Sequence, residues 1–216
     1  MRLIFEAALL AVIASYAVAA EPCDSFRDAK GRSVVDFAPP AGFIDVCSRD
    51  AQLCTQLTKG YPPSVQTIGY FVREVEWQRY QKGELKGFEQ YFIAQRAQTM
   101  SPADFAELKQ YVRRQQGSIP DHTELPRALE SQGRVSIGVT GETDDSISYG
   151  VVMRLAGRGE ASSHPLMLAA INTALQVKGE TLSLYAFDTV SQPTEVKGVT
   201  ALANSWVACL RKRNAR

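Results

Sequence analysis

The sequence predicts an α+β fold: a single domain in which helices cover an antiparallel β-sheet, as in an α/β/α sandwich. Apolar and polar residues alternate along Arg134–Thr140 and Ser146–Leu155, which is typical of a half-buried hairpin. Strong helical periodicity is confined to one segment in the middle of the chain and one at its end. Strands therefore follow one another in runs instead of alternating with helices, and this order favours antiparallel pairing.

The first twenty residues have the organisation of a secretory signal peptide. Arg2 provides a short basic start, an almost wholly apolar stretch follows, and Val18, Ala19 and Ala20 form a small-residue cleavage site. An uncleaved membrane anchor is the alternative, because the apolar stretch could nearly cross a bilayer. We expect cleavage. The chain then divides into a signal peptide, 1–20, and one α+β domain, 21–216, located in the periplasm or secreted.

The first half of the remaining chain is expected to contain four short strands. Its apolar runs are separated by proline- and glycine-containing turns, such as the segment 39–42. Residues 48–64 form a loop or a short helix, and Glu74–Lys82 suits a short helix because Trp77 and Tyr80 are three residues apart. The four expected strands are Val34–Phe37, Phe43–Val46, Val65–Val72 and Phe88–Ala97.

The clearest helix is Ser101–Gly117. Ser101 and Asp104 form a start signal around Pro102, which fits the first helical position. Apolar residues then recur at helical spacing as far as Val112. A shorter helix, Thr123–Ser131, is expected to follow.

The second half turns to β-structure and closes with a helix. After the hairpin already described, Leu166–Val177 and Thr181–Asp188 form a second one, although the first arm could instead be helical. The final helix, Pro193–Lys212, ends in cationic residues that suit its negative dipole end. Its apolar stripe consists of Val199, Leu202, Trp206, Cys209 and Leu210.

Export affects the interpretation of the four cysteines, because an even number in an oxidising compartment predicts disulfides. Cys47 and Cys54 flank a short polar stretch and are expected to form a local bridge. Cys23 then pairs with Cys209 and ties the start of the domain to the last helix. A redox pair or a metal site is the alternative, but the spacing lacks a CxxC motif and neither histidine is near a cysteine in sequence.

The order of elements resembles that of PsbP-like proteins, an α/β/α sandwich family. Val34–Phe43 resembles the opening strand pair of that fold, and Leu166–Asp188 with the helix around Trp206 resembles its closing hairpin and helix. The resemblance rests on element order alone. It implies a non-catalytic accessory or binding role.

Candidate catalytic and metal-binding residues are few. His122 has Asp121 beside it, and His164 follows two serines, but adjacent residues in polar loops seldom form a catalytic pair. Glu142, Asp144 and Asp145 could offer oxygens to Ca²⁺, although the spacing is not that of an EF-hand and a solvated turn is the simpler interpretation. We therefore assign no catalytic, cofactor-binding or metal-ligating residue and expect no cofactor.

Composition excludes some partners without identifying one. A formal net charge of +1 gives no electrostatic footprint for nucleic acid, and no second apolar stretch has membrane-spanning length. The sequence thus predicts an exported, non-catalytic accessory or binding protein with an unknown protein or small-molecule partner. The alternative is an exported hydrolase whose scattered catalytic residues surround His164 or His122.

Overall fold

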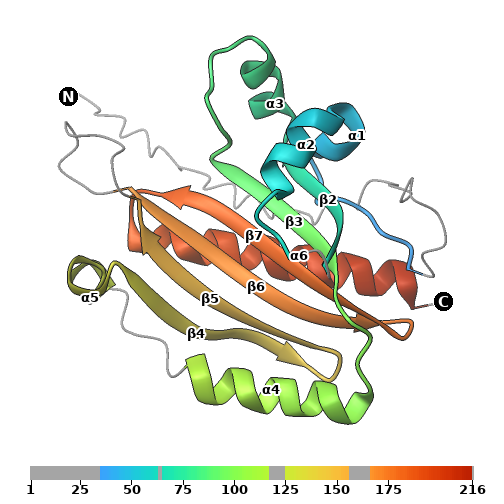
Figure 1. Cartoon of the computed structure of the whole chain (residues 1–216). Coiled ribbons are helices and arrows are strands. Elements are labelled where there is room, and N and C mark those ends of the chain that lie inside the picture. The colour runs from blue at the N-terminus through green and yellow to red at the C-terminus, as the bar shows by residue number, and fades with distance from the viewer. Residues whose placement is uncertain (1–34, 63–64, 117–124, 156–165, 216) are drawn as a thin grey trace, which may run out of the picture.

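A computed structural model describes residues 35–62, 65–116, 125–155 and 166–215. In these residues one antiparallel sheet of seven strands has the order β1-β2-β3-β7-β6-β5-β4 (Figure 1). The predicted α+β class, an antiparallel sheet covered by helices, is confirmed. The strands are β1 (Phe43–Asp45), β2 (Gln66–Arg73), β3 (Gln90–Arg96), β4 (Arg134–Thr143), β5 (Ser146–Arg154), β6 (Met167–Val177) and β7 (Glu180–Val190).

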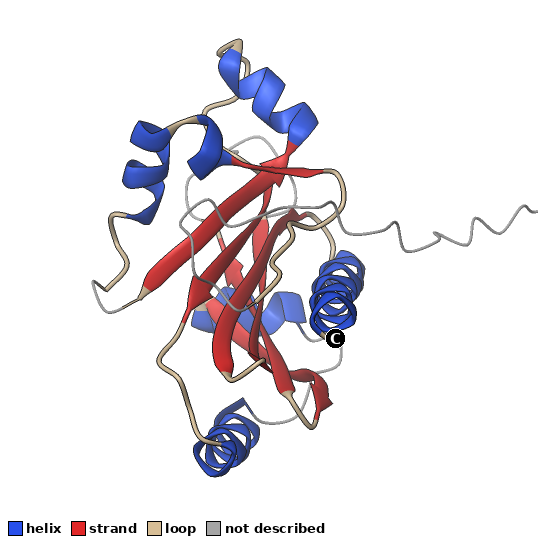
Figure 2. Cartoon of the chain, turned by 90° about the vertical axis from the view of Figure 1, so that its right-hand side faces the viewer, coloured by secondary structure: helices blue, strands red, loops and turns tan. Residues whose placement is uncertain are grey.

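Helices lie on both faces of this sheet. Figure 2 looks along the sheet and places α6 on one side, with α1, α2 and α4 on the other. None of the described helices is long and apolar enough to cross a membrane. The helices are α1 (Val46–Arg49), α2 (Ala51–Thr58), α3 (Glu74–Gln81), α4 (Pro102–Gln116), α5 (Leu125–Gln132) and α6 (Val196–Asn214), which the short 3₁₀ turn Pro193–Glu195 precedes.

The main core lies between the sheet and α6. Trp206 is at its centre, 3% exposed, and the rings of Phe37, Phe71 and Phe92 contact it edge-on with centroids 5.8, 6.0 and 5.2 Å away. Its indole nitrogen donates a hydrogen bond of 2.9 Å to the carbonyl of Ala38. A buried aromatic side chain with its one polar atom satisfied is the most favourable use of tryptophan in a core.

The predicted stripe of α6 is correct except at one position. Val199, Trp206 and Leu210 are buried, and Cys209 is half-buried. Leu202 is 37% exposed. Each residue is rotated by about 100° around the helix axis from the one before it. At this turn Ala203, not Leu202, faces the sheet.

The segment predicted as the first strand, Val34–Phe37, is not one in its described part. Residues 36–40 form no ladder, although Val35 and Phe37 are buried in the main core. The backbone of Asp36 is instead paired with a side chain: its N–H donates to Asn214 Oδ1 at 2.7 Å, and its carbonyl accepts from Asn214 Nδ2 at 2.9 Å. This helix-end asparagine satisfies the groups that a neighbouring strand would have satisfied.

The two hairpins have the predicted strand pairing. β4 pairs with β5, and β6 pairs with β7 through Met167–Val177, which excludes the helical alternative for that arm. Residues 48–64, for which the sequence predicts a loop or a short helix, contain the second half of α1 and the whole of α2. Between β3 and β4, which is at the far edge of the sheet, the chain forms α4 and α5. α4 lies on the face opposite α6 (Figure 1).

Candidate functional site

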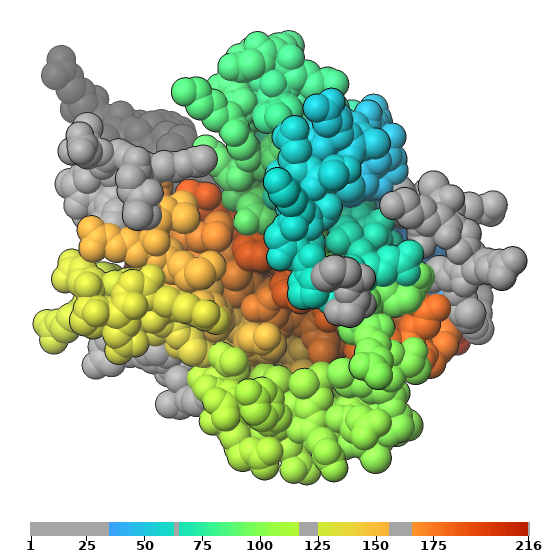
Figure 3. Space-filling model, in the orientation of Figure 1, coloured from blue at the N-terminus to red at the C-terminus, as the bar shows by residue number. Residues whose placement is uncertain are grey.

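The face opposite α6 is covered at its two ends and open in the middle. Figure 3 shows a hollow between the α1–α2 region and α4, with β6 and β7 at its base. Along α4 this hollow is an open groove of about 520 Å³. The residues that line it are Gln98, Thr99, Met100, Asp104, Glu107, Leu108, Tyr111 and Arg114.

Six of the eight tyrosines in the chain gather on this face. Three of them lie in one cross-strand row, in which Tyr70 of β2, Tyr185 of β7 and Tyr149 of β5 alternate with residues of the strands between. We call this surface the tyrosine face. It consists of Tyr61, Tyr70, Tyr91, Tyr111, Tyr149, Tyr185 and Phe187.

Four of these rings form a continuous stack across three strands. Tyr70 stacks on Tyr91 with centroids 5.2 Å apart, Tyr91 on Phe187 at 4.6 Å, and Phe187 neighbours Tyr185 at 6.3 Å. The ring planes are tilted by only 9°, 18° and 13° along that path. Strand alternation explains the arrangement, because Tyr185 and Phe187 are two residues apart and so project from the same face.

The tyrosine hydroxyl groups of this face make no hydrogen bond to the described part of the chain. Within the residues that the structure describes, none of these tyrosine hydroxyls hydrogen-bonds to a protein atom, and none is among the buried atoms that lack a partner. The hydroxyls therefore reach solvent even where the ring is buried, as for Tyr70, which is 6% exposed. Tyrosines of this kind combine an apolar ring with an available donor, the combination enriched at protein interfaces.

Burial raises the pKa of four tyrosines of this face. It raises the pKa of Tyr91 to about 12, with a smaller contribution from Tyr61. Burial also raises the pKa of Tyr70, Tyr61 and Tyr149, and for Tyr149 the neighbouring Tyr185 and Tyr111 add to that effect while Arg134 opposes it. The face thus presents hydroxyl donors, not phenolates, at neutral pH.

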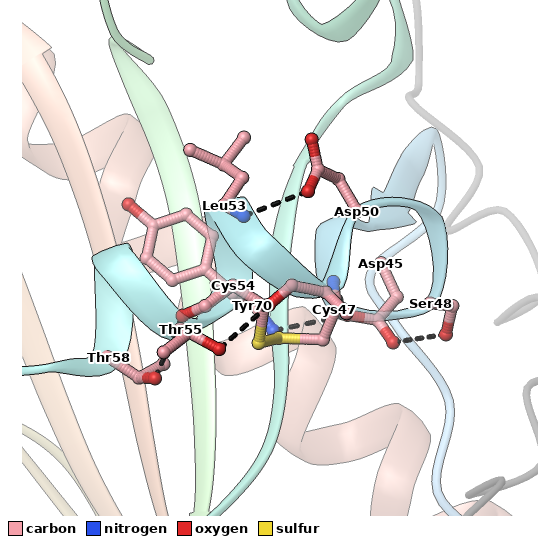
Figure 4. The surroundings of a disulfide bond; sticks show 10 residues. Asp45, Cys47, Ser48, Asp50, Leu53, Cys54, Thr55, Thr58 and Tyr70 are labelled. Atoms are coloured by element: carbon pink, nitrogen blue, oxygen red, sulfur yellow. Dashed lines mark hydrogen bonds between the residues drawn. A yellow bond between two sulfur atoms is a disulfide. The ribbon is translucent and has the colours of Figure 1, made fainter.

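One side of the hollow is formed by the α1–α2 hairpin, which a carboxylate and a disulfide hold in place. Asp45 accepts hydrogen bonds from the backbone N–H of Cys47 at 3.0 Å and from Ser48 Oγ at 2.6 Å (Figure 4). It also accepts from the N–H of Tyr70 at 3.3 Å, which links the hairpin to β2. Neither helix is long enough to be stable alone, so these contacts hold the α1–α2 hairpin in place.

The predicted bridge between Cys47 and Cys54 is present and joins α1 to α2. Both sulfur-bearing side chains are half-buried next to the apolar contacts that α1 and α2 make with β2. Cys209 also takes part in a disulfide, while its predicted partner Cys23 lies outside the described residues. The Cys23–Cys209 pairing therefore stays a prediction.

The opposite side of the hollow is α4, which is fixed to the β4–β5 hairpin. Lys109 and Arg113 both form ion pairs with Glu142, the first at 3.2 Å. These partners lower the pKa of Glu142, chiefly through the Arg113 hydrogen bonds. On the inner side of α4, Phe105 and Val112 are buried.

The acidic hairpin tip is therefore an ion-pairing element. Glu142 pairs with Lys109 and Arg113 of α4, and Asp145 pairs with Arg211 of α6 at 2.6 Å, so both carboxylates have cationic partners while they remain in contact with solvent. Among the described residues, no group of three or more histidine, cysteine or acidic side chains is arranged to hold a metal ion. His122 and His164 lie outside the described residues.

The sequence did not single out the tyrosine face. Its only signal was in β7, where Leu182, Leu184 and Ala186 alternate with residues that include Tyr185 and Phe187. The alternation indicates a strand, and the structure places Leu182, Leu184 and Ala186 in the main core and Tyr185 and Phe187 on the tyrosine face.

Comparisons with known proteins give no family. No family model and no curated protein matches this chain. Among solved structures, the crystal structure of the Saccharomyces cerevisiae Ran-binding protein Mog1p is similar at a TM-score of 0.36 and 12% identity, covering 83% of this chain and 86% of that one. A point mutant of protein Mog1 gives a TM-score of 0.35 at 13% identity, with the same coverage of both chains.

These neighbours require a correction. We expected an exported accessory or binding protein, with an exported hydrolase as the alternative, whereas the similar solved structures are of a Ran-binding protein. Neither function is carried forward, whereas none of these comparisons tests the location of the protein. At these TM-scores the likeness gives no argument about what this chain itself binds, and the resemblance to PsbP-like proteins stays a prediction.

Proposed function

We infer that this protein recognises an extended segment of another protein on its tyrosine face. The observation that carries the inference is the stack of Tyr70, Tyr91, Phe187 and Tyr185, in which every ring but the buried Tyr70 is partly exposed. The hydroxyls of its three tyrosines bond to no described protein atom. Aromatic side chains with a free polar end are enriched at protein interfaces and in their energetic hot spots.

The shape of the site favours a segment over a small molecule. Small-molecule sites are concave and enclose most of the ligand surface. The hollow here is open, with α1–α2 on one side and α4 on the other (Figure 3), and the groove within it is lined by α4 and residues 98–100. Because both sides are fixed by Asp45, the Cys47–Cys54 bridge and Glu142, the groove is preorganised, which lowers the entropy lost on binding.

A peptide-display selection tests this function. The wild-type domain and the double variant Tyr149→Ser/Tyr185→Ser are presented to the same random library. Tyr80→Phe is the control, because the Tyr80 ring packs against Trp77 and Phe88 and is not part of the stack of the tyrosine face. We expect peptides that are enriched on the wild type and on Tyr80→Phe but not on the double variant. Failure to enrich any peptide, or enrichment that is equal on the double variant, would overturn the proposal.

The compartment is a separate proposal that rests on residues 1–20, outside the described part of the chain. Arg2, the apolar stretch and the site at Ala20 support cleavage and export to the periplasm or beyond. Mass spectrometry of the protein isolated from its native source tests this. A chain that begins near Glu21 would support it, and a chain that retains residues 1–20 would refute it.

A further inference from the structure

We propose that the segment recognised is proline-rich and uncharged, and that it lies across the strands as a polyproline II helix. This inference rests on the proposed function, since it specifies the chemistry of the partner for the tyrosine face. Spacing, charge and hydrogen-bonding capacity of the face each support it.

The spacing of the tyrosines matches the pitch of that helix. In the cross-strand row Tyr70, Ile93, Tyr185, Asn172 and Tyr149, a tyrosine occurs on every second strand. Strands are about 4.8 Å apart, so successive tyrosines of the row are about 9.6 Å apart. Polyproline II has three residues per turn and rises about 3.1 Å per residue, which gives a pitch of about 9.3 Å. One side of such a helix would therefore meet Tyr185 and Tyr149 one turn apart, while Tyr70, which is 6% exposed, packs with Val46 and Leu53 at the end of the row.

The charge of the face suits an uncharged segment. The neighbouring row consists of Val72, Tyr91, Phe187, Ala170 and Val151, so neither row contains an ionisable group other than tyrosine. Burial raises the pKa of Tyr70, Tyr91 and Tyr149. A lysine or glutamate laid on these two rows would lose hydration without gaining a charged partner within them, which is unfavourable; the charged side chains Asp104, Glu107 and Arg114 lie at the α4 side of the groove.

Hydrogen-bonding capacity selects for proline in particular. The backbone groups of β3, β6 and β7 are paired within the sheet, so an incoming strand cannot add to it from this face. The hydroxyls of Tyr149 and Tyr185 instead offer donors to the carbonyl groups of a bound segment. A proline-rich segment brings carbonyls and few N–H groups, so it leaves few donors unsatisfied on an aromatic surface. Aromatic-lined grooves are a general mode of recognising this conformation.

Titration of synthetic peptides tests the inference. The probes are capped decaproline and a capped glycine–serine peptide of equal length, titrated by calorimetry into the full domain. We expect decaproline to bind at least about tenfold more tightly, with an affinity that changes less than about twofold between 50 and 500 mM NaCl. Tyr185→Phe, which keeps the ring, should weaken binding about threefold to tenfold. Tyr80→Phe should leave it unchanged.

The outcomes separate this inference from the proposed function. Equal affinity for the two peptides, no binding of decaproline, or a strongly salt-dependent affinity would overturn the proline-rich segment. If the display selection still yields peptides that depend on Tyr149 and Tyr185 but lack proline, the tyrosine face remains a recognition site and only its ligand has been misassigned. Tyr149→Phe provides a second hydroxyl deletion should Tyr185→Phe fail to fold.

Discussion

The two faces of the sheet use aromatic residues for different purposes. On the α6 face, Phe37, Phe71, Phe92 and Trp206 meet edge-to-face in a closed core, and the one polar atom among them is hydrogen-bonded. On the opposite face the rings stack nearly parallel, most remain half-exposed, and the hydroxyls have no protein partner among the described residues. The comparison indicates that α6 closes one face completely, whereas on the other a smaller core around Val46, Leu53 and Tyr70 leaves the neighbouring aromatic rings partly exposed.

The largest effect on stability is expected at the centre of the closed face. Trp206→Ala should lower the free energy of unfolding by about 3–5 kcal/mol, because it leaves a cavity among three aromatic rings and an unsatisfied carbonyl at Ala38. Tyr185→Ala, on the open face, should lower it by only about 1 kcal/mol. Chemical denaturation of both variants checks this difference. Equal losses would mean that the faces do not differ in the way described.

The next effect concerns the bridge that holds one side of the groove. Cys47→Ser combined with Cys54→Ser should destabilise the protein by about 2–3 kcal/mol, the chain-entropy value for a short loop. Urea denaturation of the double variant, compared with the wild type in the absence of reductant, measures the loss. An unchanged midpoint would show that Asp45 and the apolar contacts suffice to hold α1 and α2.

Raising the pH should lower the stability of the protein through the buried phenol groups of the open face. The folded protein raises the pKa of Tyr91 to about 12, above the value of about 10 in an unfolded chain. The contribution of such a group to stability is complete below about pH 10 and is lost as the pH rises through about 12. Denaturation midpoints measured from pH 8 to 12 should therefore fall above pH 10. The fall should be smaller in Tyr91→Phe, and an equal fall in that variant would contradict the assignment.

The smallest stability effect is expected when only a hydroxyl of the open face is removed. Tyr149→Phe and Tyr185→Phe should each change the free energy of unfolding by less than about 0.5 kcal/mol, because neither hydroxyl bonds to a described protein atom. Thermal unfolding measures this directly. A loss above about 1 kcal/mol in either variant would reveal a structural role for that hydroxyl.

Much of the closed face could be predicted from the sequence, and little of the open one. Helical spacing around Trp206 and the alternation of Leu182, Leu184 and Ala186 are local patterns that identify core residues. The tyrosine row depends instead on the pairing of β3 with β7, strands that are distant in the chain. No local pattern contains that register, so Tyr70 and Tyr185 could not be placed together.

Local sequence patterns also could not predict contacts between residues that are far apart in the chain. Val35 and Phe37 have strand-like apolar character and are buried as expected, but Asn214 rather than a neighbouring strand binds the backbone of Asp36. No pattern near Glu142 indicates its ion pairs, because its partners, Lys109 and Arg113, come from a helix in another part of the chain.

Binding and folding measured together in one variant, Tyr149→Ser/Tyr185→Ser, test whether the tyrosine face is the binding surface. Calorimetric titration with a peptide selected on the wild-type domain should show at least about a 30-fold loss of affinity, the size of an interface hot spot. Circular dichroism should show that the fold built around Trp206 is retained. Affinity within twofold of the wild type in the folded variant would contradict the central claim that the tyrosine face is the binding surface.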